Sequence, residues 1–481
     1  MKMNRYDVLI IGAGAAGIAA ALEAARAGAE VLVVDSAEQP GGTAATSGGG
    51  VFIAGSSFQA QHGIHDSPEQ AIEDWLAWGG PDVDEEWARR YVESSAGAVF
   101  GWLSELGVRW SHLQHHEGNR APRWHAPAGG GLAVMQALIR AANAEAHIAW
   151  QLGTRVAELA MAGGAVTGVH AEGPAGPIEL TGRAVVLATG GFNNDLALVR
   201  RYAPALVARG RVLLGGGAGA RGDGHTMLER VGAQLLNLDA LWIYPFATPD
   251  YLDPAGERGL VVRGLHGDLW VNAAGHRFHN EDLRGGATGA PALLRQQPPT
   301  CWSIIDARIA ARYVVSDPRY RRGGETYRDR LETLLAESPF IARGATLAEL
   351  ADATGLDRAA LSATVAEHNR RIALGEQHDS FGRALRGLQP LTEPPFFAIQ
   401  FFPLARKNLG GVRTDLNGQV LAPTGRPISG LFAAGELAGM AGGRINGRAA
   451  LEGTMLGPSL FSGRVAGRAA AGSTHTTPRS R

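Results

Sequence analysis

The chain has 481 residues, of which 45% are hydrophobic, and a formal net charge of −1. That length is enough for roughly two or three domains, and the balanced charge excludes a strong field that would attract nucleic acid or anionic lipid. Cys301 is the only cysteine in the sequence, which excludes an intrachain disulfide and a metal site built from cysteines, and no metal is expected. No apolar run reaches about 18 residues, so we expect no membrane span. A first strand near Tyr6 leaves no room for a signal peptide, and we expect a cytoplasmic protein.

The N-terminal segment YDVLIIGAGAAGIAAAL predicts a strand, a tight turn and the start of a helix. Residues 8–11 are the short apolar run of a buried parallel strand. Gly12, Gly14 and Gly17 follow it with the G-x-G-x-x-G spacing. The first glycine permits the turn, the second lets a pyrophosphate approach the backbone, and the third allows the helix to pack closely on the strand.

The next residues complete a βαβ motif. Alanine-rich residues 18–27 continue the helix, Gly28 ends it, and residues 31–34 form a second strand that ends at Asp35. The N-terminus of the helix faces the phosphates, and the Asp35 carboxylate can accept a hydrogen bond from a ribose hydroxyl. Because the fingerprint lies in a full βαβ context with an acid in the expected place, the sequence predicts dinucleotide binding. An ordinary glycine turn of an α/β protein is the alternative.

Further glycine-rich blocks follow along the chain. A second glycine-rich loop follows directly after Asp35, with the sequence SAEQPGGTAATSGGGVFIAG. It suits an extended dinucleotide whose second half must also be held. GRAVVLATGGFNND is an apolar strand that runs into Ala188–Gly191, and GARGDGHTMLERVGA contains Asp223. The last block, GLFAAGELAG, places Glu436 among glycine, alanine and leucine. No side chain within four residues can donate to that carboxylate, so either it faces solvent or a group that is not protein supplies the donors.

These blocks, in this order, resemble the flavoprotein family of fumarate reductase and succinate dehydrogenase subunits, which also contains ketosteroid dehydrogenases and related FAD-dependent desaturases. The resemblance covers nearly the whole chain and is nearer the ketosteroid dehydrogenase-like FAD-binding dehydrogenases than the true fumarate reductases. The closing GGRINGRAALEGTMLG resembles a less characterised branch of FAD-binding dehydrogenases, with Arg444 or Arg448 where the ketosteroid enzymes have a tyrosine. It implies FAD as the cofactor and implies that Glu436 binds hydroxyls of the ribityl chain, which would supply the missing donors. Residues 41–50 contain no histidine of the kind that tethers FAD in the respiratory branch, so non-covalent FAD is expected.

The resemblance also implies where the cofactor is held. A helix that begins near residue 454 would point its N-terminal amides at the flavin, where they stabilise negative charge. The residues expected to bind FAD lie in the glycine-rich blocks, at one position between them and in the closing segment: Gly12, Gly14, Ala15, Ala16, Gly17, Asp35, Ser36, Gly42, Thr43, Ser47, Gly48, Gly49, Val156, Ala188, Thr189, Gly190, Gly191, Asp223, Gly435, Glu436, Thr454, Met455 and Leu456.

The expected fold class is α/β, a Rossmann-like FAD-binding domain with an inserted α+β capping (substrate) domain. TLAELADATGLDRAALSATVAEHNRRIALG in the capping domain predicts two amphipathic helices capped by Thr346 and Asp357. The resemblance implies that the substrate lies between cap and flavin. The expected divisions are residues 1–235 and 395–472 for the FAD-binding domain, 236–394 for the capping domain and 473–481 for a disordered tail.

The chemistry shared by the family is the addition or removal of hydrogen across a carbon–carbon bond next to a carbonyl. Such a site needs a hydride partner at the flavin, a proton donor or acceptor on the opposite face, and donors for the carbonyl oxygen. Relative to fumarate reductases, the sequence has Tyr244 where a histidine precedes a proline, and Lys407 and Asn408 where a His-Thr pair stands. Arg284 comes one residue earlier than the acid arginine of that family, whereas Arg263 is retained. Fumarate is therefore not the expected substrate.

Six residues are candidates for the chemistry, and four of them have an alternative explanation. Instead of acting in catalysis, Tyr244 could be a tyrosine of the core, and Arg284 could be a surface arginine paired with Glu281 or Asp282. Instead of contacting the substrate, Arg263 could link loops of the cap, and Lys407 could neutralise the charge of reduced flavin. His125, in RWHAPAGGG, fits a structural histidine better than a proton carrier. The candidate catalytic residues are Tyr244, Arg284 and Arg444, and the candidate substrate-binding residues are Arg263, Lys407 and Arg448.

The leading hypothesis is an FAD-dependent dehydrogenase that introduces a C=C bond α,β to a ketone or carboxylate of a mid-sized, partly apolar substrate. Its partners would be that small molecule and an electron acceptor that the sequence does not identify. A reductase of the fumarate or urocanate type is the enzyme alternative. It needs a donor of low potential, and no haem-binding or FMN-carrying extension is expected here. A flavin carrier without chemistry is the alternative from another class, against which the charged and aromatic capping region argues.

Overall fold

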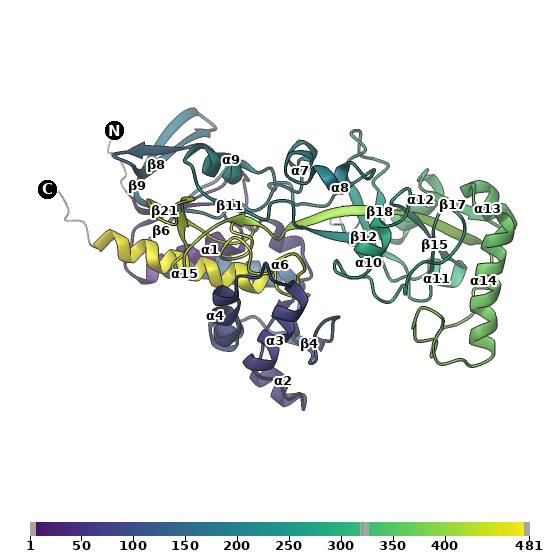
Figure 1. The fold of residues 1–481 in the computed structure, drawn as a ribbon. Coiled ribbons are helices and arrows are strands. Elements are labelled where there is room, and N and C mark those ends of the chain that lie inside the picture. Colours follow the sequence, from purple (N-terminus) through teal and green to yellow (C-terminus); the bar gives the residue numbers. More distant parts are fainter. Residues whose placement is uncertain (1–5, 318–319, 321–326, 476–481) are drawn as a thin grey trace. The chain divides into compact units, whose positions relative to one another are not determined.

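A computed structural model describes residues 6–317, 320 and 327–475 (Figure 1). The chain divides into two compact units, the first with residues 1–203, 216–242 and 407–481 and the second with residues 204–215 and 243–406. This division differs from the expected boundaries at 235/236 and 394/395. The reason is that β10 (Leu213–Leu214) pairs with β18 (Phe396–Asn408), which joins the flanking residues to the second unit.

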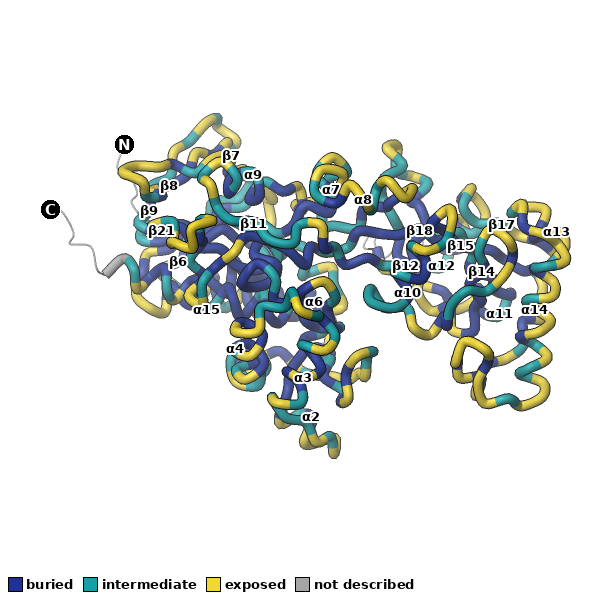
Figure 2. Tube along the Cα trace, viewed as in Figure 1, coloured by how far each residue is buried: buried dark blue, intermediate teal, exposed yellow. Residues whose placement is uncertain are grey.

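The first unit is built on a mainly parallel sheet with the strand order β20-β21-β9-β1-β2-β6. Figure 1 labels β21, β9 and β6 of this sheet. Its central strands β1 (Tyr6–Ile11), β2 (Val31–Val34) and β9 (Gly176–Leu187) contain apolar runs that are buried, as expected for strands covered on both faces. Figure 2 colours the interior of this unit dark blue, for buried. β1 pairs in parallel with both β2 and β9. The carboxyl ends of the three strands therefore meet at one edge of the sheet, where the glycine-rich loops begin.

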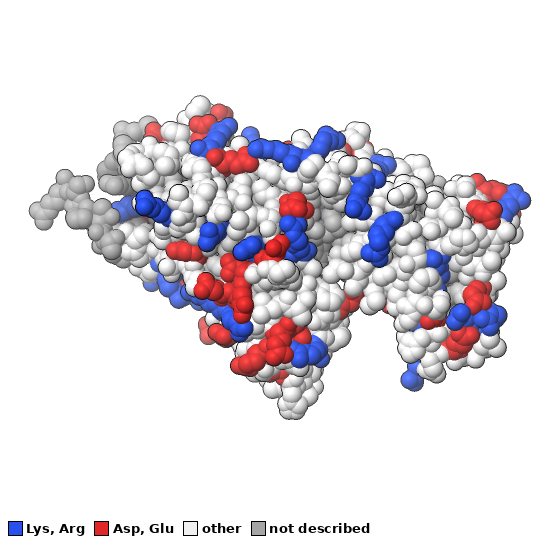
Figure 3. All heavy atoms as spheres, in the orientation of Figure 1, with Lys and Arg blue, Asp and Glu red and all other residues white. Residues whose placement is uncertain are grey.

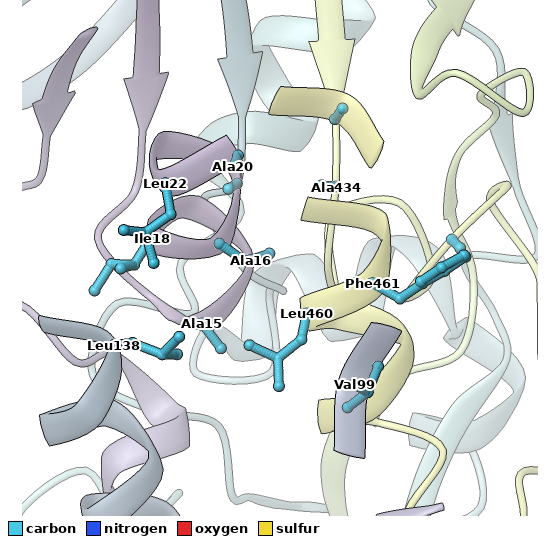
Figure 4. Packing of buried hydrophobic residues seen from close by; sticks show 14 of the residues in the cluster. Ala15, Ala16, Ile18, Ala20, Leu22, Val99, Leu138, Ala434, Leu460 and Phe461 are labelled. Carbon is cyan, nitrogen blue, oxygen red and sulfur yellow. The ribbon is translucent and has the colours of Figure 1, made fainter. Parts of the chain in front are cut away.

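Two helices pack closely on each other beside this sheet. The predicted helix after the glycine turn is α1 (Ala15–Arg26), which begins three residues earlier than expected, and α15 (Leu456–His475) lies against it (Figure 4). A Cβ added to Gly463 would lie 2.2 Å from the carbonyl oxygen of Ala16, and glycine is therefore required there for the close approach. α15 extends to His475, and residues 476–481 of the expected disordered tail lie outside the described residues.

The second unit contains a sheet with the order β14-β15-β18-β12-β13-β16, and β10 and β17 also pair with β18. The two amphipathic helices predicted here are α13 (Leu347–Thr354) and α14 (Arg358–Ala373). Their predicted caps are confirmed. The Thr346 side chain accepts from the backbone N–H of Glu349 in the first turn of α13, and Asp357 caps α14 in the same way.

The other elements are further strands of these two sheets, the strands of two smaller sheets, and helices. In the first unit they are η1 (Thr43–Thr46), β3 (Val51–Phe52), α2 (Ser57–Gln61), α3 (Pro68–Gly79), α4 (Glu85–Ser95), η2 (Ala96–Gly101), α5 (Trp102–Glu105), β4 (Trp110–Gln114), β5 (Trp124–Pro127), α6 (Gly130–Ala144), β6 (Ile148–Gln151), β7 (Arg155–Ala162), β8 (Ala165–Gly173), α7 (Leu196–Tyr202), α9 (Asp223–Arg230), β11 (Leu235–Leu236), β19 (Gly411–Val412), β20 (Gln419–Leu421) and β21 (Pro427–Ala433). The remaining elements are α8 (Pro204–Val207), β12 (Leu241–Pro249), β13 (Gly259–Arg263), β14 (Leu269–Val271), α10 (Gly289–Leu294), β15 (Cys301–Ile305), α11 (Ala307–Ala310), β16 (Val314–Val315), α12 (Tyr327–Glu337) and β17 (Ile341–Gly344).

The surface charge agrees with the composition. Basic and acidic side chains are intermingled on the face shown in Figure 3, and no large patch of one sign is visible on that face. Within the described ranges, no helix combines the length and the apolar character needed to cross a bilayer.

Candidate functional site

The turn between β1 and α1 has the geometry of a phosphate cradle. Gly12 has a φ of +113°, and a Cβ there would lie 2.3 Å from the carbonyl oxygen of Ala188, so only glycine fits. A Cβ on Gly17 would lie 1.8 Å from the carbonyl oxygen of Gly12. A Cβ on Gly14, by contrast, would meet no atom within 4 Å, and this residue caps α1 without a side-chain hydrogen bond. The backbone amides at the start of α1, including those of Ala15 and Ala16, therefore begin at an open space suited to an anion.

The acid at the end of β2 lies beside this cradle. Oδ2 of Asp35 accepts the backbone N–H of Ala13 at 2.6 Å, and Oδ1 accepts that of Ala37 at 2.8 Å. The two bonds fix the carboxylate next to the glycine turn. A carboxylate has about four lone-pair sites, so Asp35 keeps the capacity to accept from a ribose hydroxyl. The neighbouring Ser36 is exposed.

The second glycine-rich loop approaches the first. A Cβ on Gly42 would lie 3.1 Å from the Cα of Gly14, which places the two loops in near contact. Ser47 organises the loop, since its hydroxyl donates to the carbonyl of Ala44 at 2.8 Å and accepts the N–H of Gly49 at 3.1 Å. The predicted residues Thr43 and Gly48 lie in the same loop.

The loop after β9 adds polar atoms to this edge of the sheet. Oγ1 of Thr189 is buried and has no hydrogen-bond partner among the described residues. Gly190 has a φ of +78°, with no atom within 4 Å of the position of a Cβ. Two other residues predicted to bind the cofactor, Val156 and Asp223, lie outside this loop and make contacts within the protein. Val156 is buried in a hydrophobic cluster, and Asp223, at the start of α9, forms an ion pair with Arg155 at 2.5 Å.

Glu436 has protein donors, which corrects the expectation that only the flavin would supply them. Its Oε1 accepts from Nδ2 of Asn193 at 2.9 Å and from the backbone N–H of Asn408 at 3.0 Å, and its Oε2 lies 3.4 Å from Nζ of Lys407. None of these three donors lies within four residues of Glu436, and Asn193 is 243 positions away along the chain. Sequence reasoning missed Asn193, and the only signal was an asparagine pair that follows the glycines of ATGG after one phenylalanine.

The closing segment, residues 439–455, is an irregular but mostly buried loop that ends at α15. Since the helix begins at Leu456, the amides near Thr454 and Met455 lie at its N-terminus, as predicted. The loop is held from the side of α3, where the indole Nε1 of Trp78 donates to the carbonyl of Ala450 at 3.1 Å. Such bonds satisfy backbone groups that would otherwise be buried without partners.

The two arginines of this loop differ in their surroundings. The backbone carbonyl of Arg444 accepts the N–H of Asp84 at 3.2 Å, which fixes the main chain at that point. The side chain of Arg448 is half exposed and forms ion pairs with Asp82 at 2.7 Å and Asp239 at 2.9 Å. The guanidinium of Arg448 is therefore engaged by protein carboxylates.

In the second unit, the predicted Tyr244 and Arg263 lie together. The ring of Tyr244 is stacked on Phe246, with centroids 5.0 Å apart and an interplanar angle of 20°. The guanidinium of Arg263 lies over both rings, 5.7 Å from the centroid of Tyr244 and 5.4 Å from that of Phe246. The arrangement is a cation–π contact that orients the tyrosine.

Arg284 is fixed by a carboxylate that sequence reasoning did not single out. Its Nη2 lies 2.5 Å from Oδ1 of Asp268, which is fully buried, whereas Glu281 and Asp282 were the expected partners. Burial lowers the pKa of Arg284, but the charge and hydrogen bond of Asp268, together with the charges of Asp282 and Glu281, outweigh burial and raise the pKa overall. The guanidinium therefore stays charged and is suited to holding an oxygen rather than to releasing a proton.

His125 is a structural residue, as expected. It is fully buried, with Nε2 2.7 Å from the hydroxyl of Ser56 and Nδ1 2.8 Å from the carbonyl oxygen of Arg123. Burial lowers its pKa to about 4. A neutral imidazole with both nitrogens engaged does not carry protons at neutral pH.

The polar atoms left over in the first unit fit a ligand with both donors and acceptors. A long dinucleotide has such groups in its ribityl chain, riboses and pyrophosphate, and FAD fits this donor set. Over the described ranges, no group of three or more histidine, cysteine or acidic side chains is placed to hold a metal ion. The buried atoms without a partner among the described residues of these loops are Thr189 Oγ1, Asn193 Oδ1, Asn408 Nδ2 and Asn446 Oδ1.

Comparison with known proteins points to the same cofactor. The family described as FAD binding domain matches residues 7–456. A KsdD-like steroid dehydrogenase of Mycobacterium tuberculosis is 32% identical over 545 aligned positions, which cover 97% of this chain and 95% of that protein. The crystal structure of 3-ketosteroid-Δ4-(5α)-dehydrogenase from Rhodococcus jostii RHA1 with 4-androstene-3,17-dione is similar with a TM-score of 0.74, at 28% identity over 97% of each chain. The open conformation of a flavocytochrome c3 fumarate reductase is similar with a TM-score of 0.78, at 31% identity over 98% of this chain and 78% of that one.

Proposed function

The chain belongs to this family of FAD-binding oxidoreductases, and on that premise we propose that it introduces a C=C bond α,β to a ketone or carboxylate of a mid-sized, partly apolar substrate. FAD is its cofactor, and the predicted α/β FAD-binding fold is confirmed. The observation that carries the proposal is the match to a steroid dehydrogenase over nearly the full length of both chains. Similarity of that extent includes the second unit as well as the glycine-rich cradle.

The residues of the first unit would hold the cofactor and the charge that develops near it. When bound, FAD supplies the hydride acceptor. The amides at the start of α1 would hold the pyrophosphate, Asp35 would accept from the ribose, and Glu436 would accept from the ribityl chain. Arg444 would stabilise negative charge on the carbonyl oxygen of the substrate, because a fixed positive charge lowers the energy of an enolate-like transition state.

The residues of the second unit would accept the α-proton and bind an oxygen of the substrate. Tyr244, oriented by Phe246 and Arg263, would accept the α-proton as the phenolate, whose negative charge the neighbouring guanidinium of Arg263 favours. Arg284, held charged by Asp268, would bind an oxygen of the substrate. Its raised pKa, and its position one residue before that of the acid arginine of fumarate reductases, argue against a role as the acid.

Two of the predicted substrate-binding residues take other roles in this proposal. Arg448 is bound by Asp82 and Asp239, so we assign it to holding the closing segment instead of the substrate. Lys407 contacts Glu436, and we assign it to balancing charge at the cofactor. We further propose that FAD is bound without a covalent link, because residues 41–50 contain no histidine. The cytoplasmic location stays a prediction.

A reductase working in the opposite direction is the second candidate, favoured by the similarity to the flavocytochrome c3 fumarate reductase. Anaerobic mixing separates the two directions. The oxidised protein is mixed with saturated ketones and acids, and the photoreduced protein is mixed with the matching enones and enoates. Bleaching of the flavin by a saturated ketone is the expected result. Rapid reoxidation by an enoate, with no saturated analogue able to reduce the flavin, would instead identify a reductase.

A further inference from the structure

The carboxylate of Glu436 belongs to a closed network of hydrogen bonds in the first unit. Oε1 accepts from Nδ2 of Asn193 at 2.9 Å and from the backbone N–H of Asn408 at 3.0 Å. The same Nδ2 donates its second hydrogen to Oδ1 of Asn408 at 2.7 Å, and that oxygen also accepts the backbone N–H of Phe192 at 2.9 Å. Both hydrogens of the Asn193 amide therefore have an acceptor.

The network determines the orientation of both amides. Turning the Asn193 amide over would place its oxygen against Oε1 of Glu436 and Oδ1 of Asn408, three acceptors without a donor. Turning the Asn408 amide over would place its NH₂ group against the N–H of Phe192. Glycine is required where the chain passes the network, because a Cβ on Gly191 would lie 2.1 Å from Oδ1 of Asn408 and 2.5 Å from Oε1 of Glu436.

The two oxygens of Glu436 consequently differ. Oε1 has two donors at ordinary hydrogen-bond distances, whereas Oε2 lies 3.4 Å from the ammonium of Lys407, which is long for a charge-assisted bond. The side chain of Glu436 is 13% exposed, so the carboxylate is neither sealed in the core nor free in solvent. Oε2 is the oxygen with capacity for another donor.

A second observation points to a ligand at this place. Asn193 and Asn408 are fully buried, yet Oδ1 of the first and Nδ2 of the second have no partner among the described residues. Buried polar atoms of native proteins almost always have a partner, from the protein or from a bound group. These two atoms mark a polar space beside Glu436, as expected where a polar ligand and the water bound with it would lie.

We propose that Asn193 and Asn408 are positioning residues of the cofactor site, which lock the Glu436 carboxylate with Oε1 bound to protein and Oε2 presented to FAD. The inference rests on the proposed function, in which Glu436 binds FAD. A carboxylate that is already held in its bound orientation loses little side-chain freedom when the cofactor arrives, and its full hydrogen-bond strength contributes to affinity. Asn193 acts through Glu436, so removal of its amide should weaken FAD binding only while Glu436 is present.

A double-mutant cycle on the apoprotein tests this coupling. The dissociation constant of FAD is measured by calorimetry for the wild type, Asn193→Leu, Glu436→Ala and the double variant. Asn193→Leu and Glu436→Ala should each weaken binding by about tenfold or more. The double variant should bind no more weakly than Glu436→Ala alone, within about twofold, because the two residues form one unit.

The outcomes separate the two levels of the proposal. Unchanged affinity in Glu436→Ala would contradict the role of Glu436 in FAD binding. Weakened binding in Glu436→Ala together with wild-type binding in Asn193→Leu would overturn the positioning role alone. Full additivity in the double variant would also overturn it, since Asn193 would then act independently. Asn369→Leu in α14 is the matched control, because it removes two hydrogen bonds to Leu391 in the second unit, and its affinity for FAD should equal that of the wild type.

Asn193→Asp provides a second test, the pH dependence of FAD affinity, which a variant that merely fails to fold would not reproduce. The variant keeps the shape of the side chain but places a second carboxylate against Oε1 of Glu436, with Lys407 as the charged neighbour. Two carboxylates this close share a proton, so the FAD affinity of the variant should rise as the pH falls from about 8 to about 6, while that of the wild type changes little. A flat profile that equals the wild type would overturn the proposal even if Asn193→Leu does not fold.

Discussion

The indole Nε1 of Trp75 donates a hydrogen bond of 2.9 Å to the carbonyl oxygen of Ile445, a residue 370 positions further along the chain. Trp75 lies in α3 and is 1% exposed, and Ile445 lies in the closing segment directly after Arg444. Together with the bond from Trp78 to Ala450, this contact holds the irregular loop from one side. The position of Arg444 therefore depends on two tryptophans far away in sequence.

Trp75→Phe should lower the free energy of unfolding by about 2 kcal/mol or more, because a buried carbonyl loses its donor and a cavity forms. Chemical denaturation of the apoprotein measures this change. Trp110→Phe is the control, since it removes a bond between the indole and the side chain of Ser104 at an exposed site, and its effect should stay below about 1 kcal/mol. Equal effects in the two variants would mean that the closing segment is not held by Trp75.

Arg444→Ala should lower kcat/KM by about 100-fold or more, equivalent to roughly 2.7 kcal/mol of transition-state stabilisation. FAD content should stay normal, because the proposed target of this arginine is the substrate oxygen. Steady-state kinetics with a substrate found in the anaerobic screen, normalised to bound flavin, measure the effect. A loss of activity explained entirely by loss of FAD would assign Arg444 to the cofactor.

Tyr244→Phe should lower kcat with little change in substrate affinity, because only the transition state loses a proton acceptor. The stacking on Phe246 and the contact with Arg263 involve the ring and are kept in this variant. Rapid mixing separates substrate binding from flavin reduction. If the variant reduces its flavin at the wild-type rate, the proton acceptor is another group.

His225 should make stability fall at acid pH. It is fully buried in α9, packs edge-on against Phe192 with centroids 5.1 Å apart, and neither ring nitrogen has a partner among the described residues. Burial lowers its pKa from 6.5 to about 4. Between these two pKa values the unfolded chain binds a proton that the folded protein does not bind. The free energy of unfolding therefore decreases as the pH falls from about 6.5 towards about 4.

His225→Phe tests this dependence. The variant removes two buried polar atoms and the titrating group, so its free energy of unfolding should exceed that of the wild type increasingly as the pH falls through this window, by up to about 3 kcal/mol. Denaturation at several pH values gives the two curves. Parallel curves for variant and wild type would show that His225 does not titrate in the folded protein as inferred.

The purified protein should be yellow, and acid precipitation should release its FAD into the supernatant. The physical reason is that every proposed contact to the cofactor is a hydrogen bond or a charge interaction, which unfolding removes. The absorbance of the supernatant measures released FAD. Pigment that stays with the denatured protein would demonstrate a covalent link.

Several parts of this protein were determined locally and could be predicted from the sequence. The βαβ unit around Gly12 and Gly17 depends on residues within one short segment, where backbone sterics and apolar runs decide the structure. The caps Thr346 and Asp357 bind backbone groups three residues away, so they too were predictable. The family resemblance, confirmed by the match over residues 7–456, added the identity of the cofactor.

Tertiary structure alone decided which partners the charged residues have. Glu436 is held by Asn193 across 243 positions, and Arg284 is held by Asp268 instead of the acidic residues beside it. A buried charge takes the partner that folding brings within about 3 Å, and the energy of that contact depends on distance and burial but not on separation along the chain. Sequence therefore identified the glycines that make room for the cofactor, whereas the orientation of the carboxylate among them followed from contacts between distant loops.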